Sequence, residues 1–406
     1  MRNVAVLSPA AVQQAVDQAA HFNLYALPDP DVPTGAIIGS GGSVVGMHVD
    51  QMLHRFSVIC RPPTSRTPLA ARNLVGELVA RLTQRWMILP DAAAAAMDRD
   101  PQPTALDTSR SQRFVMLDTQ CTFANGEDGF RGFGTGLTLP VSVGRPPELL
   151  AMAVGTITQG FGRFERHEEG TYIYCGRLSP QGAFTGNFLL RLIDRQETFR
   201  ELEDLRAIDV RGEGEGDITY LLFRGQAVPS DSVTPRLGAD GRPNGLIVEQ
   251  GLRLLELDAV GRERPLSIDR VGPAIGHITA NVTFNPASPG GSVRDPIPFT
   301  AYDEFVFHDS ESGQRIGSFT ADSLEGRVFR TQILGQPGIR FGGIGRIHGG
   351  DGVFAGITGL MTDNSVVMFE PHVSASLYLL RVDDPDGRFS SRVDPEQRRP
   401  FRWDGR

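Results

Sequence analysis

The sequence predicts a mainly β protein made of two related antiparallel barrels, with a helical segment inserted near the N-terminus. Three observations predict this fold. Short apolar segments follow one another through most of the 406 residues and are separated by Gly, Pro, Asp and Ser. Glycines concentrate at 349–359, where they suit the sharp bends of a closed sheet. Short motifs also recur about half a chain apart, as a duplicated unit would produce.

Length and composition limit the function classes. A chain of 406 residues is long enough for two domains that each bury a core. Its formal net charge of −8 argues against a nucleic-acid-binding surface, which needs dense positive charge. The three cysteines lie far apart and do not suggest a disulfide framework, so we expect a cytoplasmic location. No apolar run reaches the roughly eighteen residues of a membrane span, so we expect no membrane association.

The segment TPLAARNLVGELVARLTQRW, which starts at Thr67, predicts a helix within a helical region that we place at 67–97. Thr67 suits the N-cap and Pro68 suits the first helical position. Apolar residues recur at helical spacing along this segment and would form one buried stripe: Leu74, Val75, Leu78, Val79, Leu82 and Trp86.

The other segments alternate as antiparallel strands do, and this pattern also sets the expected domains. We expect an N-terminal barrel at 1–228 and a C-terminal barrel at 245–384. Between them, residues 229–244 (PSDSVTPRLGADGRPN) carry no periodic pattern and suit a linker. Residues 385–406 form a polar tail.

An internal repeat supports two related domains. The Gly-Arg pair at 162–163 matches the pair at 345–346, and the Leu-Leu-Arg triplet at 189–191 matches the one at 379–381. Each separation is close to half the chain, so a duplicated unit explains both matches.

The glycine-rich segment GGDGVFAGITG does not fit a nucleotide-binding loop. A Walker-type loop requires a lysine, which this chain lacks entirely, and a dinucleotide fingerprint requires a following helix. The residues that follow Gly352 are β-like instead. A strongly coiled hairpin in a small barrel explains the glycines, because they relieve strain where strands bend.

The same segment resembles the Gly-Gly-x-Gly-Ile-Phe-x-Gly signature of the allene oxide cyclase family, which dirigent proteins share in looser form. Residues 297–321 are similar to that family's entry strand, charged hairpin and glycine-containing return strand, and residues 374–382 are similar to its closing strand. The resemblance covers roughly 245–384 and reaches the first half only through the repeat. It implies eight-stranded antiparallel barrels around an apolar cavity, and it is compatible with a homo-oligomer because related barrels often associate.

The resemblance implies a cofactor-independent cyclase or isomerase of specialised metabolism. Its partner would be a hydrophobic small molecule such as a polyketide, a terpenoid or an oxidised lipid, folded by the cavity into one reactive conformer. The alternative is a non-catalytic, dirigent-like or lipocalin-like binding protein for an apolar ligand. We expect no cofactor and no metal; His48 and Asp50 would share a strand face, but no third ligand is identifiable.

Glu304 and His308 are the best candidates for acid–base catalysis, with help from Tyr302. The three residues share one face of a strand, so they would act together if that face lines the cavity. The alternative is that this face is the polar exterior, and that Phe305 and Phe307 on the other face fill the core.

Five further residues are expected to contact the substrate. Tyr172 and Tyr174 share a strand face in the first barrel, and the others lie in the segments that carry the resemblance: Asn281, Phe354 and Tyr378. The plant cyclases use a glutamate near their first strand, whereas GHITANVTFNP offers Asn281 and no carboxylate. We therefore do not expect the cyclase family's own reaction.

Overall fold

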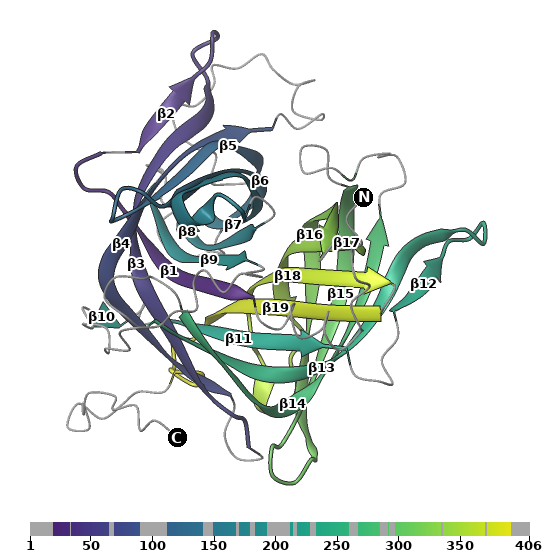
Figure 1. Ribbon diagram of the computed structural model, residues 1–406. Coiled ribbons are helices and arrows are strands. Elements are labelled where there is room, and N and C mark those ends of the chain that lie inside the picture. The colour runs from purple at the N-terminus through teal and green to yellow at the C-terminus, as the bar shows by residue number, and fades with distance from the viewer. Residues whose placement is uncertain are drawn as a thin grey trace, which may run out of the picture. The chain divides into compact units, whose positions relative to one another are not determined.

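The computed structural model describes most of the chain, and within that part almost every regular element is a strand (Figure 1). The described residues are 19–32, 34–64, 69–89, 112–140, 149–167, 170–178, 183–192, 212–213, 217–227, 233–259, 267–284, 291, 297–333, 336–369 and 372–390.

The chain divides into two units, which we describe separately. The N-terminal unit comprises Leu24–Arg55 and Leu78–Leu192. The C-terminal unit comprises Met1–Asn23, Phe56–Glu77 and Ile193–Arg406. The long strands β3 (Val44–Arg61) and β4 (Ala70–Ile88) therefore contribute residues to both units.

Eight strands of the C-terminal unit close into an antiparallel barrel, which confirms this part of the prediction. They are β11 (Ile218–Gln226), β13 (Pro243–Ala259), β14 (Ser267–Phe284), β15 (Ile297–His308), β16 (Arg315–Ile333), β17 (Gln336–His348), β18 (Gly359–Phe369) and β19 (His372–Asp383). Each strand pairs with the next, and β19 pairs back with β11, so every one of them has a partner on both sides. A short arm strand, β12 (Val233–Leu237), pairs with β13 outside this ring.

The N-terminal unit contains a second antiparallel sheet with the same order of elements. Its strands are β1 (Ala20–Pro28), β3, β4, β5 (Gln112–Phe123), β6 (Gly129–Pro140), β7 (Leu149–Phe161), β8 (Thr171–Leu178) and β9 (Phe184–Leu192). Neighbours from β4 to β9 pair in sequence, and β1 pairs with β3. The arm strand β2 (Gly35–Ile38) pairs with β3, as β12 does with β13.

A short 3₁₀ turn marks the same position in both units. η1 (Gly162–Phe164) follows β7, and η2 (Gly352–Phe354) follows β17. A Cβ atom at Gly160 would lie 1.8 Å from the carbonyl oxygen of Phe164, and one at Gly350 would lie 2.0 Å from that of Phe354. The glycines are therefore required where the chain doubles back on its own backbone.

The two motifs of the sequence repeat differ in how they map onto these elements. The Leu-Leu-Arg triplets at 189–191 and 379–381 lie in corresponding strands, β9 and β19. In contrast, Gly162-Arg163 lies in η1, whereas 345–346 lies in the strand β17 that precedes η2. The true counterpart of η1 is the glycine-rich turn at 352–354.

The predicted helix is wrong, because residues 70–88 form strand β4. Within it, Leu82, Gln84 and Trp86 are buried, whereas Arg81 and Thr83 between them are exposed, which is the period of a strand. β4 pairs with β5 and, near its start, with β10 (Gly212–Glu213). These ladder partners outweigh the local preference for a helix. Thr67 and Pro68, the expected start of the helix, and residues 90–97 of the expected helical region lie outside the described part of the chain.

The structure also differs at the edges of the expected domains. β11, which precedes the expected linker, is a strand of the C-terminal barrel, and residues 233–237 of that linker form β12. At the other end, Phe389 of the expected tail is buried and stacks on Phe354 with ring centroids 6.2 Å apart. In the described residues, no helix is long and apolar enough to span a membrane.

Candidate functional site

The interior of the C-terminal barrel is arranged in layers along its strands. One layer is an apolar cluster that combines aliphatic residues with two phenylalanines: Leu246, Val248, Ala280, Val282, Phe299, Val328, Phe341 and Val367. A second layer consists of buried aromatic rings that contact one another: Phe223, Phe305, Phe307, Phe319 and Phe354. Polar residues form a further layer, and its Asp303 alternates on β15 with Ala301, which packs against the apolar cluster, and with Phe305 of the aromatic layer.

Asp303 is the central residue of this polar layer. It lies on β15 between Ala301 and Phe305 in the inward-facing alternation, and its exposed fraction is 3%. Its strand neighbours on either side, Ala280 and Ala321, are small apolar residues. Asp303 is thus a buried carboxyl group whose two neighbours across the ladders are apolar.

A second carboxyl group, Asp363, lies close enough to act on Asp303 electrostatically. Asp363 lies on β18 opposite Gly343 on one side and Tyr378 on the other, and it is half-buried. A Cβ atom at Gly343 would lie 3.5 Å from the Cβ of Asp363 and 3.4 Å from the Oγ of Ser323. The missing side chain of Gly343 therefore leaves space directly against this polar layer.

Neutral polar groups complete the layer through hydrogen bonds. The Tyr378 hydroxyl donates to Oε1 of Gln250 over 3.1 Å, and Nε2 of Gln250 donates to the Ser374 hydroxyl over 3.1 Å. The Ser365 hydroxyl bonds to Asp363 and lies 2.6 Å from the hydroxyl oxygen of Ser376. These contacts hold the layer in a single arrangement.

Burial determines the protonation of the site. Burial raises the pKa of Asp303 well above its ordinary value, and the charge of Asp363 raises it further, against a smaller lowering by the hydrogen bond with Ser323. Burial likewise raises the pKa of Tyr378, with Asp363 and Asp303 adding to it. The raised pKa extends the pH range in which Asp303 is the neutral carboxylic acid, the form that can donate a proton.

The three residues predicted for acid–base chemistry lie on the opposite face of β15. Tyr302 has an exposed fraction of 45%, Glu304 is exposed and His308 is half-buried, whereas Phe305 and Phe307 are fully buried. The structure thus has the alternative arrangement, in which Glu304, His308 and Tyr302 face the exterior. Burial, followed by the nearby charges of His277 and Arg315, lowers the pKa of His308.

The predicted substrate contacts fall in different places. Tyr378 belongs to the polar layer and Phe354 to the aromatic layer of the C-terminal barrel. Asn281 pairs with Tyr302 across β14 and β15 and is half-buried on the exterior side. Tyr172 and Tyr174 are fully buried in the N-terminal unit.

Sequence reasoning missed Asp303, although a signal was present. In DEFVFH the alternation puts Asp303 on the same strand face as Phe305 and Phe307. A lone carboxylate on the apolar face of a strand is unusual, because burying a charge is costly. That contrast points to Asp303 rather than to its neighbour Glu304.

The buried residues Tyr172, Tyr174 and Trp86 of the N-terminal unit bond to neutral partners instead. The Tyr172 hydroxyl bonds to Thr119 over 3.2 Å, and the Tyr174 hydroxyl donates to Oε1 of Gln51 over 2.7 Å. Nε1 of Trp86 donates to Gln84 over 2.9 Å. Burial raises the pKa values of Tyr172 and Tyr174, so both phenols stay neutral.

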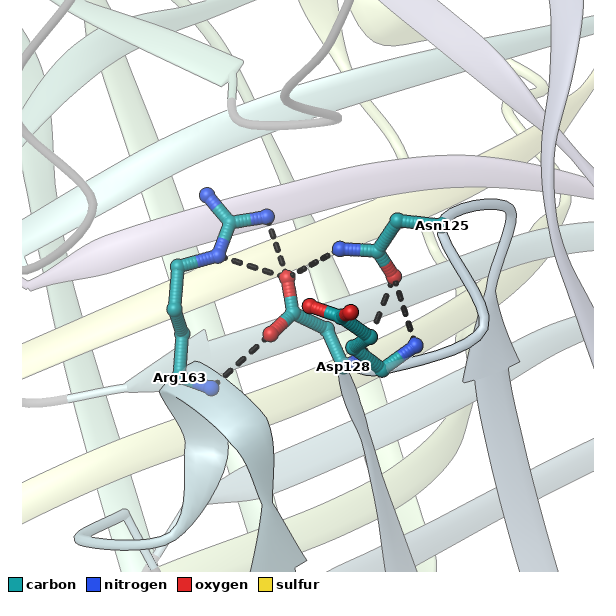
Figure 2. A network of polar contacts seen from close by, with 4 residues as sticks. Asn125, Asp128 and Arg163 are labelled. Carbon is teal, nitrogen blue, oxygen red and sulfur yellow. Dashed lines mark hydrogen bonds and ion pairs between the residues drawn. The ribbon is translucent and has the colours of Figure 1, made fainter.

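Asp128 is a buried aspartate of that unit, as Asp303 is of the C-terminal barrel, but the role of Asp128 is structural. Figure 2 shows its carboxylate between Arg163 and Asn125. Arg163 donates to it from its backbone N–H over 2.8 Å and from Nε over 2.6 Å, and Nδ2 of Asn125 donates over 2.8 Å. Burial would raise the pKa of Asp128, but these hydrogen bonds lower it overall. Asp128 therefore anchors η1 as a permanent anion.

No group of three or more His, Cys, Asp or Glu side chains in the part of the chain that the structure describes is arranged to hold a metal ion. Comparison with known proteins gives no match: no family model, no curated protein and no solved structure is significantly similar to this chain.

Proposed function

We propose that this protein is an allene oxide cyclase-like tandem barrel and that its C-terminal barrel isomerises an apolar small molecule without a cofactor. Both units would be related barrels, since they share one order of strands and a glycine turn at the same place. The observation that carries the proposal is Asp303, a carboxyl group 3% exposed between an aromatic and an apolar layer.

In this proposal, Asp303 is the general acid. Its O–H bond breaks as the proton passes to an alkene, epoxide or carbonyl group of the substrate, which leaves an electron-deficient carbon. An internal double bond attacks that carbon and closes a ring, or a neighbouring C–H bond supplies a new alkene. The proton released from carbon returns to the Asp303 carboxylate, so the product is an isomer of the substrate and the acid is regenerated.

The surrounding residues would bind and orient the substrate. Tyr378 holds the amide of Gln250, whose second N–H on Nε2 donates to an oxygen of the substrate, and Asp363 supplies negative charge near the developing cation. The aromatic layer around Phe305 would fold a flexible chain into a reactive conformer and exclude water. These features favour a terpenoid, a polyketide or an oxidised lipid.

The test is turnover of candidate polyenes to products of equal mass. Asp303→Asn keeps the shape of the side chain and removes the acid, so it should lower turnover by about 10²- to 10⁴-fold. Glu304→Gln on the exterior face is the matched control and should leave turnover within about twofold. Unchanged turnover in Asp303→Asn, or a large loss in Glu304→Gln, would contradict the proposal. Binding without any product would identify a carrier instead.

A further inference from the structure

A buried amide group in the N-terminal unit is only half satisfied. The side chain of Gln51 has an exposed fraction of 1%, and its Oε1 accepts a hydrogen bond from Tyr174 over 2.7 Å. Its Nε2 has no hydrogen-bond partner within the described residues. Burial of an unpaired donor is costly, so a group at this position that could accept a hydrogen bond would be bound favourably.

The repeat in the C-terminal unit shows what is missing. Gln51 lies in the sequence Val-Asp-Gln-Met-Leu of β3, and Gln250 lies in Val-Glu-Gln-Gly-Leu of β13. Both amides accept a hydrogen bond from a buried tyrosine, but Nε2 of Gln250 also donates to Ser374 over 3.1 Å. The donating tyrosines lie on different strands, Tyr174 on β8 and Tyr378 on β19, and only Gln250 has a partner for its own donor group among the described residues.

The difference arises at one position of the last strand. Ser374 is paired with Val367 near the start of β19, and Phe184 is paired with Leu178 at the start of β9, the corresponding strand. Phe184 therefore occupies the position of Ser374, and a phenyl ring cannot accept the hydrogen bond that a hydroxyl accepts. The replacement leaves the Gln51 donor available.

Aromatic rings surround Tyr174, the partner of Gln51. Tyr174, which bonds to Gln51, lies 5.1 Å from Phe184 and 6.3 Å from Trp86 between ring centroids, and both contacts are edge-on. Trp86 also stacks on Phe114 at 4.5 Å. Flat, uncharged ligands pack well against such rings.

We propose that the N-terminal unit binds a neutral, flat, apolar molecule that carries a carbonyl group, and that the carbonyl oxygen accepts a hydrogen bond from Nε2 of Gln51. This second site is independent of the isomerase proposed for the C-terminal barrel. It uses none of the residues assigned to that reaction.

The first experiment compares two probes of similar shape, 2-acetylnaphthalene and 2-isopropylnaphthalene, by titration calorimetry with the full chain. The ketone should bind about tenfold more tightly than the hydrocarbon, because it alone can accept the hydrogen bond. Gln51→Met should abolish this preference, and Gln120→Met, the same change at an exposed position of β5 in the N-terminal unit, should preserve it. Equal affinity for both probes, no saturable binding, or an unchanged preference in Gln51→Met would overturn the proposal.

A second pair of variants separates the hydrogen bond from the space around it. Phe184→Ser restores the repeat's hydroxyl beside Gln51, so it should remove the preference for the ketone. Phe184→Ala opens nearly the same space without an acceptor and should keep that preference. If the two variants discriminate between the probes to the same extent, the Gln51 donor does not select the ligand and the proposal fails.

Discussion

The two units carry the same order of strands, but corresponding interior positions hold polar side chains of different kinds. In the C-terminal barrel, Asp303 on β15 lies opposite Ala321 on β16. In the N-terminal unit, the corresponding position on β5 is Thr119, which lies opposite Gly132 on β6. An ionisable acid in one unit thus replaces a neutral hydroxyl in the other, on a common backbone.

The second carboxyl group, Asp363 on β18, is likewise replaced by an uncharged side chain, Tyr174, at the corresponding position on β8. Asp363 lies opposite Tyr378 across β18 and β19, and Tyr174 lies opposite Phe188 across β8 and β9. The backbone ladders hold the strands in both units whatever these side chains are. The comparison teaches that the strand frame sets where interior groups lie, and that side-chain exchange within the frame sets which chemistry they can perform.

The largest expected difference between the units is at the anchor of the 3₁₀ turn. Asp128 is 4% exposed and bound to Arg163, whereas Asp351, which precedes η2, is 51% exposed and bound to Arg315. Asp128→Ala should lower the free energy of unfolding by about 3 kcal/mol, because it leaves buried donors without their acceptor. Asp351→Ala should cost about 1 kcal/mol or less, because exposed ion pairs contribute little.

Urea unfolding followed by far-ultraviolet circular dichroism measures both losses, because strands of both units contribute to the signal. Trp86 lies in the N-terminal unit, so Asp128→Ala should also shift the transition that its fluorescence reports. Equal losses in the two variants would show that the burial of the anchor does not matter. The anchors of the two 3₁₀ turns would then not differ in their contribution to stability.

The next expected difference is in the pH dependence of stability. The raised pKa of Asp303 means that the folded protein retains a proton that the unfolded chain releases above about pH 4. The contribution of Asp303 to stability therefore falls as the pH rises from about 4 toward its pKa in the folded state. Asp303→Asn should remove this slope and raise the free energy of unfolding by about 2 kcal/mol at pH 8.

Denaturation at a series of pH values between 4.5 and 8 tests this expectation. Thr119→Val, at the corresponding neutral position, is the control and should leave the slope unchanged. A slope that persists in Asp303→Asn would show that another group carries the buried proton.

Much of the fold could be predicted from the sequence because it depends on local rules. Alternation identified most strands, and the glycines at 349–359 identified the turn before β18, where only glycine fits against Phe354. Strand β4 was mistaken for a helix because its apolar residues satisfy both periods in part. Leu78 distinguishes the helical period from the strand period: a helix would bury it in the predicted stripe, but it is 37% exposed. Pairing with strands distant in sequence decided the outcome.

The candidate site was harder to predict, because it depends on which face of a strand is inside. Glu304 and Asp303 are adjacent in sequence, and a shift of one residue exchanges the interior for the exterior. The strands that pair with β15 on both sides decide this, and their register cannot be read from β15 alone. The apolar partners Phe305 and Phe307 were the available guide, and they point to Asp303.

The smallest expected effect concerns the tyrosines bound to the two glutamines. Tyr378→Phe leaves Gln250 with its hydrogen bond to Ser374, so it should cost about 1 kcal/mol of unfolding free energy. Tyr174→Phe should cost about 2 kcal/mol, because the buried amide of Gln51 then has no partner for either of its groups within the described residues. Thermal unfolding of both variants measures the difference. If Tyr174→Phe costs no more than Tyr378→Phe, Gln51 must already have a partner that the N-terminal unit alone does not supply, such as a bound molecule or water.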